Sequence, residues 1–176
     1  ESISAVVSDE MQRDAILAVL IAGVFMLIYI WIRFKDVKFG ASAVIALLHD
    51  VLVVLMVYAV VRIPVGNTFI ACMLTIVGYS INATIVIFDR IRENRKLMVK
   101  EPIDAIVNTS ISQTISRSIN TSLTTFITIF VLYLMGVTAI REFALPLMAG
   151  IICGAYSSIC ITGALWYMMK KRSKKK

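Results

Sequence analysis

The chain has 176 residues, of which 59% are hydrophobic and 16% charged, and its mean hydropathy is +0.86. Soluble domains are roughly 45–50% apolar and 25% charged, so this chain has more apolar surface than a water-soluble domain of its size can bury. Intrinsic disorder is excluded as well, because disordered chains are poor in Leu, Ile, Val and Phe. The composition therefore predicts an integral membrane protein.

Five long apolar runs divide the chain, each close to the ~20 residues that a helix needs to cross a ~30 Å hydrocarbon core. In lipid such runs must be helical, because each backbone group needs a hydrogen-bond partner within its own segment. We therefore predict an all-α, integral membrane bundle of five transmembrane helices, at about residues 15–32, 39–61, 65–88, 118–135 and 144–169. A separate amphipathic helix at about 102–115 begins with Pro102 and has one apolar face, so we expect it along the cytoplasmic interface.

The basic residues sort by side when these helices are laid across a membrane. Fourteen of the 18 fall on the side of the tail 170–176, three fall on the other side, and Arg117 lies at the membrane edge. Basic residues collect on the cytoplasmic side, where Trp31, Trp166 and Tyr167 would also fit an aromatic belt. We therefore expect the tail in the cytoplasm and the acidic segment 1–14 outside. The net charge of +7 then reflects topology and anionic lipid rather than nucleic acid binding.

The acidic segment 1–14 begins without an initiator Met or a signal-type sequence that would carry it across the membrane. We expect it to be the external end of a domain that an upstream transmembrane helix anchors. The chain shown would then be a C-terminal piece.

Asp50 is the carboxylate that lies inside a predicted span, midway along the run 39–61. A charged residue at this depth costs about 2.5–3.5 kcal/mol on insertion scales and is usually functional. Asp50 is therefore a candidate for proton coupling, and the alternative is a structural hydrogen-bond anchor. His49 lies about 100° away round the helix, so we expect the two side chains to point apart and His49 to bond a neighbouring helix.

A second polar region is predicted where the third and fourth spans are rich in hydroxyl and amide side chains. Tyr79 and Asn82 lie in the third span, and Arg117 and Asn120 open the fourth. In lipid such residues join helices or line a polar path, and both interpretations stay open. Arg117 reaches the depth of Asn82 if the fourth helix begins a turn earlier; otherwise its side chain extends to the interface.

The fifth span has small residues at every fourth position, beginning with Gly150 and Gly154, which permits close helix packing. The three cysteines lie in apolar runs without metal-type spacing, so we expect small buried side chains and no metal site. The sequence offers no nucleophile–base pair and no phosphate loop. Neither an enzyme nor a bound cofactor is therefore expected.

Three runs make the chain recognisable. The longest extends from Thr75 to Asn94 and reads TIVGYSINATIVIFDRIREN; the runs 48–51 and 113–124 read LHDV and QTISRSINTSLT. These segments resemble the signature of the SecF family of protein-export membrane proteins, within the resistance-nodulation-division superfamily. The resemblance covers the chain from about Arg13 onward.

The resemblance implies a fold, a location and a set of partners. SecF proteins have six transmembrane helices with an external domain after the first, so this chain would contain the last five. The family acts in the bacterial cytoplasmic membrane with SecD, beside the Sec translocon channel, and uses the proton-motive force to help draw exported polypeptides out. The lipid bilayer completes the expected partners, and nucleic acid is not among them.

One position departs from the family pattern. After the run Gly78–Asn82 the family has an Asp, its proton-coupling carboxylate, which is expected to meet an arginine that matches Arg117; this chain has Ala83. Three outcomes stay open: Asp50 takes over the titration, SecD supplies the acid, or the subunit has no proton role of its own. The hypotheses are therefore a proton-coupled export subunit, a scaffold that docks SecD and the translocon, and an exporter of drugs or lipids, which the motifs disfavour.

Overall fold

A computed structural model of the chain describes residues 2–34 and 36–173, with the backbone alone at 2–9, 11, 12, 15, 16, 19, 67 and 173. All regular structure in these ranges is helical. The helices are α1 (Ser2–Phe34), α2 (Val37–Val61), α3 (Asn67–Leu97), α4 (Ile103–Met135) and α5 (Thr138–Tyr156), which continues through a π-helical turn η1 (Ser157–Thr162) into α6 (Gly163–Ser173).

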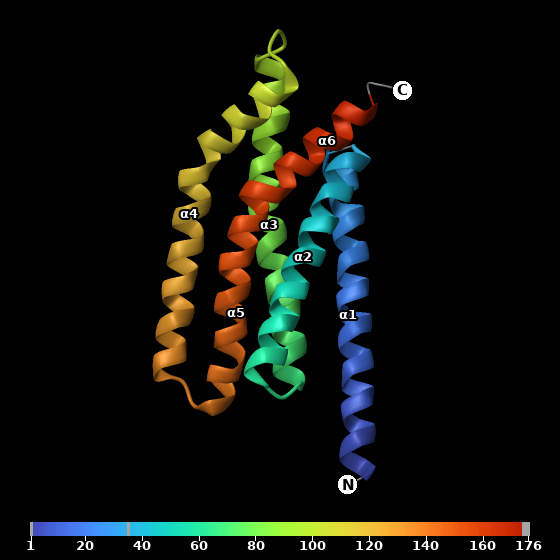
Figure 1. Cartoon of the computed structure of the whole chain (residues 1–176), viewed down its shortest axis with the longest axis vertical. Helices are drawn as coiled ribbons and strands as arrows, with labels where there is room; N and C mark the ends of the chain where they lie inside the picture. The colour runs from blue at the N-terminus through green and yellow to red at the C-terminus, as the bar shows by residue number, and fades with distance from the viewer. Residues whose placement is uncertain (1, 35, 174–176) are drawn as a thin grey trace.

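The helices run alternately up and down, so the connections gather at two ends (Figure 1). The start of α1, the α2–α3 turn and the α4–α5 turn lie at one end. The α1–α2 turn, the α3–α4 loop and the end of α6 lie at the other. Helix α3 occupies the centre, because it contacts α1, α2, α4 and α5. This arrangement makes α3 a shared wall for any site built between the helices.

The outer surface of the bundle is apolar, as a lipid-facing surface must be. Large apolar side chains stand exposed on several helices, among them Phe25, Leu52 and Leu123. Four helical segments are long and apolar enough to cross a membrane, and the described apolar stretch of α1, Leu20–Phe34, is shorter than the other four. The prediction of an all-α membrane bundle is confirmed.

The predicted break between an interfacial helix at 102–115 and a span at 118–135 is wrong, because α4 is one continuous helix. The polar run that suggested a boundary does not interrupt the helix. Its hydroxyls bond carbonyls one turn back, as in Thr114 Oγ1 to Ser110 O (2.9 Å) and Thr121 Oγ1 to Arg117 O (2.8 Å). The fourth span therefore extends well beyond the apolar run.

The connection between the third and fourth spans is likewise helical for most of its length. α3 continues to Leu97, so only the short loop 98–102 separates it from α4. The two helices are joined above the apolar region by Asn94 Nδ2, which donates to Ser110 Oγ (2.9 Å) and to Gln113 Oε1 (2.8 Å). A helical hairpin joined by side-chain hydrogen bonds thus forms the connection between the third and fourth spans.

The ends of the chain fall partly outside the described residues. Residues 2–14 of the expected external segment continue α1, and residues 170–173 of the expected tail belong to α6. Glu1, Lys35 and the lysines at 174–176 lie outside the described part.

An aromatic cluster closes the bundle near the α1–α2 turn. Phe39 stacks on Trp166 with ring centroids 4.7 Å apart and an interplanar angle of 7°, and Phe34 and Phe88 pack around them. Trp166 is 0% exposed and belongs to the core rather than to an aromatic belt, as its position in the sequence had suggested, whereas Trp31 is 59% exposed. Burying these rings joins α1, α2, α3 and α6 at one end.

Two glycines let α5 approach α3 closely. A Cβ atom on Gly150 would lie 2.5 Å from Cδ1 and 2.6 Å from Cγ1 of Ile76, and one on Gly154 would lie 3.3 Å from Cβ of Ser80. Both glycines are buried. The contact of α5 with the middle of α3 therefore requires that Gly150 and Gly154 have no side chain.

We expect Gly150→Ala to lower the free energy of unfolding by about 1–3 kcal/mol, because the added methyl group overpacks the contact with Ile76. Thermal unfolding of the purified protein in detergent measures the loss. Gly78→Ala is the matched control on α3: its Cβ would meet nothing within 4 Å, and Ala is the better helix former.

Ile76→Val removes Cδ1 and should restore part of the stability lost in Gly150→Ala. Equal stabilities of the Gly150→Ala and Gly78→Ala variants would contradict the proposed close contact.

Candidate functional site

Asp50 is buried at the point where α2 meets α3 and α5. Its side chain is 0% exposed. Oδ2 accepts hydrogen bonds from Ser80 Oγ of α3 at 2.5 Å and from Ser157 Oγ, the first residue of η1, at 2.7 Å. A buried acid is tolerated when such donors surround it. Asp50 thus bonds two other segments of the bundle through one oxygen.

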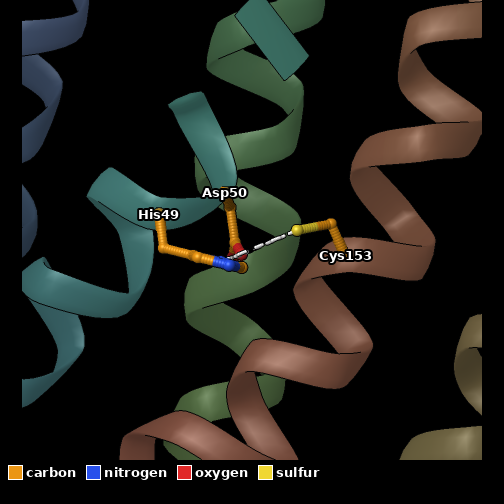
Figure 2. A group of neighbouring side chains, drawn as sticks. All are labelled: His49, Asp50 and Cys153. Atoms are coloured by element: carbon orange, nitrogen blue, oxygen red, sulfur yellow. Dashed lines mark hydrogen bonds and ion pairs between the residues drawn. The ribbon is translucent and has the colours of Figure 1, made fainter. Parts of the chain in front are cut away.

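The second oxygen of Asp50 faces a different pair of side chains. His49 Nδ1 lies 3.1 Å from Oδ1, and Cys153 Sγ of α5 lies 3.4 Å from Oδ1 and 3.7 Å from His49 Nδ1. Figure 2 shows the three side chains converging from α2 and α5, with α3 behind them. The expectation that His49 and Asp50 point apart is wrong, because the imidazole bends back toward its neighbour while also reaching α5.

Buried hydroxyls continue from Asp50 along the α3–α5 interface. Thr84 Oγ1 and Ser158 Oγ are 3.2 Å apart, and Ser158 Oγ donates to the carbonyls of Gly154 (2.7 Å) and Ser80 (3.5 Å). Thr162 Oγ1 donates to the carbonyl of Ser157, five residues earlier, at 3.1 Å. This last bond fits the wider π-helical turn, a form that is frequent at functional sites.

Ser157 has two acceptors within reach, and this gives the site a simple chemistry. While Asp50 is ionised, Ser157 Oγ donates to Oδ2; the carbonyl of Gly154 is its alternative acceptor at 3.2 Å. If Oδ2 takes up a proton, the Ser157 hydrogen can turn to Gly154 and the hydroxyl oxygen can accept from Asp50, since a hydroxyl both donates and accepts. The Ser157 hydroxyl can therefore act as donor or as acceptor toward Oδ2 of Asp50.

Arg117 lies in a second polar region, on the α3–α4 side of the bundle. A cavity of about 80 Å³ lies between α3 and α4 and is lined by Tyr79, Asn82, Ala83, Val86, Arg117, Ser118, Thr121 and Ser122. Asn82 and Arg117 thus reach the same depth, as the longer α4 allows. In the described part of the chain the Arg117 side chain has no hydrogen bond or ion pair; the Tyr79 hydroxyl donates to Ser122 Oγ at 3.1 Å.

The structure does not bring the two candidate coupling residues together. Asp50 faces Ser80 of α3, while Arg117 shares its cavity with Ala83. Asp50 is therefore not a substitute partner for Arg117. Asn120 is exposed on α4 and does not line the cavity, and the predicted packing residues Gly150 and Gly154 lie on α5 beside the Asp50 site.

Sequence reasoning missed Ser157 and Cys153 as members of the Asp50 site. Both lie more than 100 positions from Asp50 in the chain, so no local motif connects them. The signal that could have marked Ser157 is the group of hydroxyl residues within an otherwise apolar span. The expectation of buried cysteines holds for Cys72, while Cys153 is partly buried and Cys160 is exposed.

The comparisons with known proteins agree with one another. The family model described as "Protein export membrane protein SecD/SecF, C-terminal" matches residues 1–172. A protein translocase subunit SecF from Alicyclobacillus acidocaldarius is 47% identical over 178 residues, which cover 99% of this chain and 58% of the relative. A protein translocase subunit SecDF from Bacillus subtilis is 41% identical, with 99% of this chain and 24% of the relative covered.

Solved structures support the same relationship. The crystal structure of SecDF in its super-membrane-facing form matches with a TM-score of 0.86 and 44% identity, over 94% of this chain and 22% of that one. A SecDF structure from Thermus thermophilus, described as a translocon-associated membrane protein, matches equally well over 91% of this chain. The chain spans little more than half the length of the SecF relative from Alicyclobacillus. On these grounds the chain belongs to the SecD/SecF family of protein-export membrane proteins, of which it represents the C-terminal membrane portion.

Proposed function

We propose that this chain is the membrane portion of a SecF-like subunit of the Sec protein translocase, which assists protein export across the bacterial cytoplasmic membrane using the proton-motive force. Family membership supports the translocase assignment. The observation that carries the proton-dependent part is Asp50, a fully buried carboxyl group that bonds α3 and η1.

Asp50 is placed to convert a change of protonation into a change of helix contact. Its Oδ2 bonds to Ser80 and Ser157 link α2 to α3 and to η1, and Cys153 of α5 bonds its Oδ1. Uptake of a proton by Oδ2 would exchange donor and acceptor in one of these bonds. It would weaken the other bond, because a neutral acid accepts less strongly than a carboxylate. Helix α5 and the π-helical turn would then be the elements that respond.

Arg117 is the second candidate for proton coupling, and it requires an acidic partner. Its cavity holds amide and hydroxyl groups from Asn82 and Tyr79, but the described residues that line it include no acid. A carboxylate from a partner subunit would complete an ion pair there. SecD is the partner that we propose, because several relatives carry SecD and SecF in one chain under the name SecDF.

The alternative function is a scaffold that docks SecD and the translocon without a proton-coupling site of its own. Ala83 favours this alternative, since an uncharged methyl group stands beside Arg117. Asp50 would then be a structural anchor that holds α2 against α3 and α5. The two functions differ in whether export depends on charge at these positions.

The proposed orientation places the α3–α4 loop and the end of α6 in the cytoplasm. The last turns of α3 and α6, which lie at this end (Figure 1), hold Arg95, Lys96, Lys170, Lys171 and Arg172. The opposite half of the described chain has Arg13, Arg62 and Arg141. This distribution follows the excess of basic residues on the cytoplasmic side. The exported polypeptide and the Sec channel would then contact the opposite end of the bundle or its lipid-exposed sides.

We expect Asp50→Asn, made in the full-length protein together with SecD, to lower proton-motive-force-dependent export to the level of cells that lack the complex. The amide keeps the size of Asp50 and can bond Ser80 and Ser157, so the helix contacts should survive while the titratable group is lost. Asp104→Asn, on an exposed acid of α4, is the matched control and should leave export unchanged. Export is measured as processing of a secreted substrate with and without an uncoupler.

The same measurement on Arg117→Ala completes the test. If Asp50→Asn and Arg117→Ala both retain export and its sensitivity to the uncoupler, neither residue is a coupling site and the scaffold function is favoured.

Ala83→Asp distinguishes the two functions by adding an acid, whereas the other variants remove a charged group. It introduces a titratable group that lines the cavity with Arg117, and we expect it to increase the proton-dependent part of export, because the cavity would then hold both an acid and the arginine that can pair with it. Ala83→Asn supplies the same bulk without charge and should give no gain. The gain should disappear in the Ala83→Asp, Arg117→Ala double variant; no gain from Ala83→Asp would support the scaffold.

A further inference from the structure

His49, Asp50 and Cys153 offer three metal-binding atoms that face one another within the membrane bundle. Nδ1 of His49, Oδ1 of Asp50 and Sγ of Cys153 all lie within 4.8 Å of one another. The three come from two helices, α2 and α5 (Figure 2). We propose that they form a binding site for a thiophilic divalent cation of the Zn²⁺ class.

The spacing of the three atoms matches that of ligands on a tetrahedral ion. Zinc bonds of about 2.0–2.1 Å to nitrogen, 2.0–2.2 Å to oxygen and 2.3 Å to sulfur place neighbouring ligands about 3.3–3.6 Å apart. The observed separations are 3.1 Å for N–O, 3.4 Å for S–O and 3.7 Å for S–N. Shifts of a few tenths of an ångström would therefore bring all three ligands to bonding distance of one ion.

The charges of the ligands suit an ion held in an apolar bundle. Cys153 would bind as the thiolate and give its proton to water, Asp50 would bind as the carboxylate, and His49 would bind through neutral Nδ1. The two negative charges offset the dication, so the occupied site is neutral and avoids the cost of a net charge in the membrane. Thiolate and imidazole together favour zinc over magnesium or calcium.

Neighbouring hydroxyl groups hold the Asp50 carboxylate in position as a ligand. Ser80 and Ser157 donate to Oδ2 of Asp50, which leaves Oδ1 for the metal; such outer contacts normally orient metal ligands. The His49 side chain is 38% exposed while Asp50 is 0% exposed. His49 thus forms the outer edge of the site and Asp50 its buried base.

This site goes beyond the proposed export function and does not depend on it. The metal site is separate from the Arg117 cavity, because none of the three ligands lines that cavity. Its physical effect would be to tie α2 to α5 through Oδ1 of Asp50, on the side opposite to the serine bonds. Binding can therefore be tested without any measurement of export.

The test is a titration of the full-length protein in lipid nanodiscs with Co²⁺, followed by displacement with Zn²⁺. We expect one Co²⁺ per chain with a thiolate-to-cobalt charge-transfer band, and loss of that band when Zn²⁺ is added. Cys160→Ser and Cys72→Ser are matched controls that remove the other two cysteines of the described chain and should leave the band unchanged.

Cys153→Ser should remove the band and weaken Zn²⁺ binding by at least about 100-fold, while Ser157→Ala, which removes an outer contact, should weaken it by about 10–100-fold. Both variants are close in size to the native residue, and an unchanged helical circular dichroism spectrum verifies their fold. The proposal is overturned if the native protein shows no charge-transfer band, or if Cys153→Ser binds as tightly as the native protein.

Discussion

The constraint on which the structure depends is the burial of one carboxyl group among membrane helices. An acid at the position of Asp50 is tolerated only when donors from other helices surround it, and this requirement brings α3 and α5 against α2. Gly154 lets Ser80 approach, because a side chain there would crowd Ser80. The π-helical turn begins at Ser157, whose hydroxyl reaches Asp50. The close packing of α5 on α3 and the hydrogen bonds to Asp50 thus occur at the same place in the bundle.

Helix α3 separates two polar regions of different character. Its Ser80 faces Asp50 and its Thr84 faces Ser158, within a buried set of hydroxyls. Its Tyr79 and Ala83 instead line the cavity that contains Arg117. A change at one region can reach the other through α3, which they share, or through the direct packing of α4 on α5. Any coupling between the acid and the arginine in this chain is therefore mechanical rather than a direct ion pair.

Hydropathy predicted the all-α membrane bundle, since lipid permits little else for long apolar runs, and it singled out Asp50 as the acid within a span. It placed a boundary in α4 where none exists, because serine and threonine hydroxyls can bond back to the helix and need no break. It could not place Cys153 or Ser157 beside Asp50, since tertiary packing rather than spacing creates those contacts. Trp166 shows the same limit: its position suggested lipid, but Phe39 covers its ring.

The Asp50 region lacks a fixed cation and the Arg117 region lacks an acid. This asymmetry is the basis for proposing a partner subunit. Asp50 has hydroxyl partners on Oδ2 and imidazole and thiol partners on Oδ1 but, among the described residues, no fixed cation beside it. Arg117 has a permanent charge and a polar cavity, but no acid among the residues that line it. An arginine in a membrane bundle is favourable only where an anion, water or the interface satisfies it. Arg117 is exposed on α4, so water or the interface can satisfy it in this chain alone. In the proposed complex, where Ala83 replaces the acid of the family pattern, a carboxylate that pairs with Arg117 would be presented by the partner subunit at the α3–α4 face.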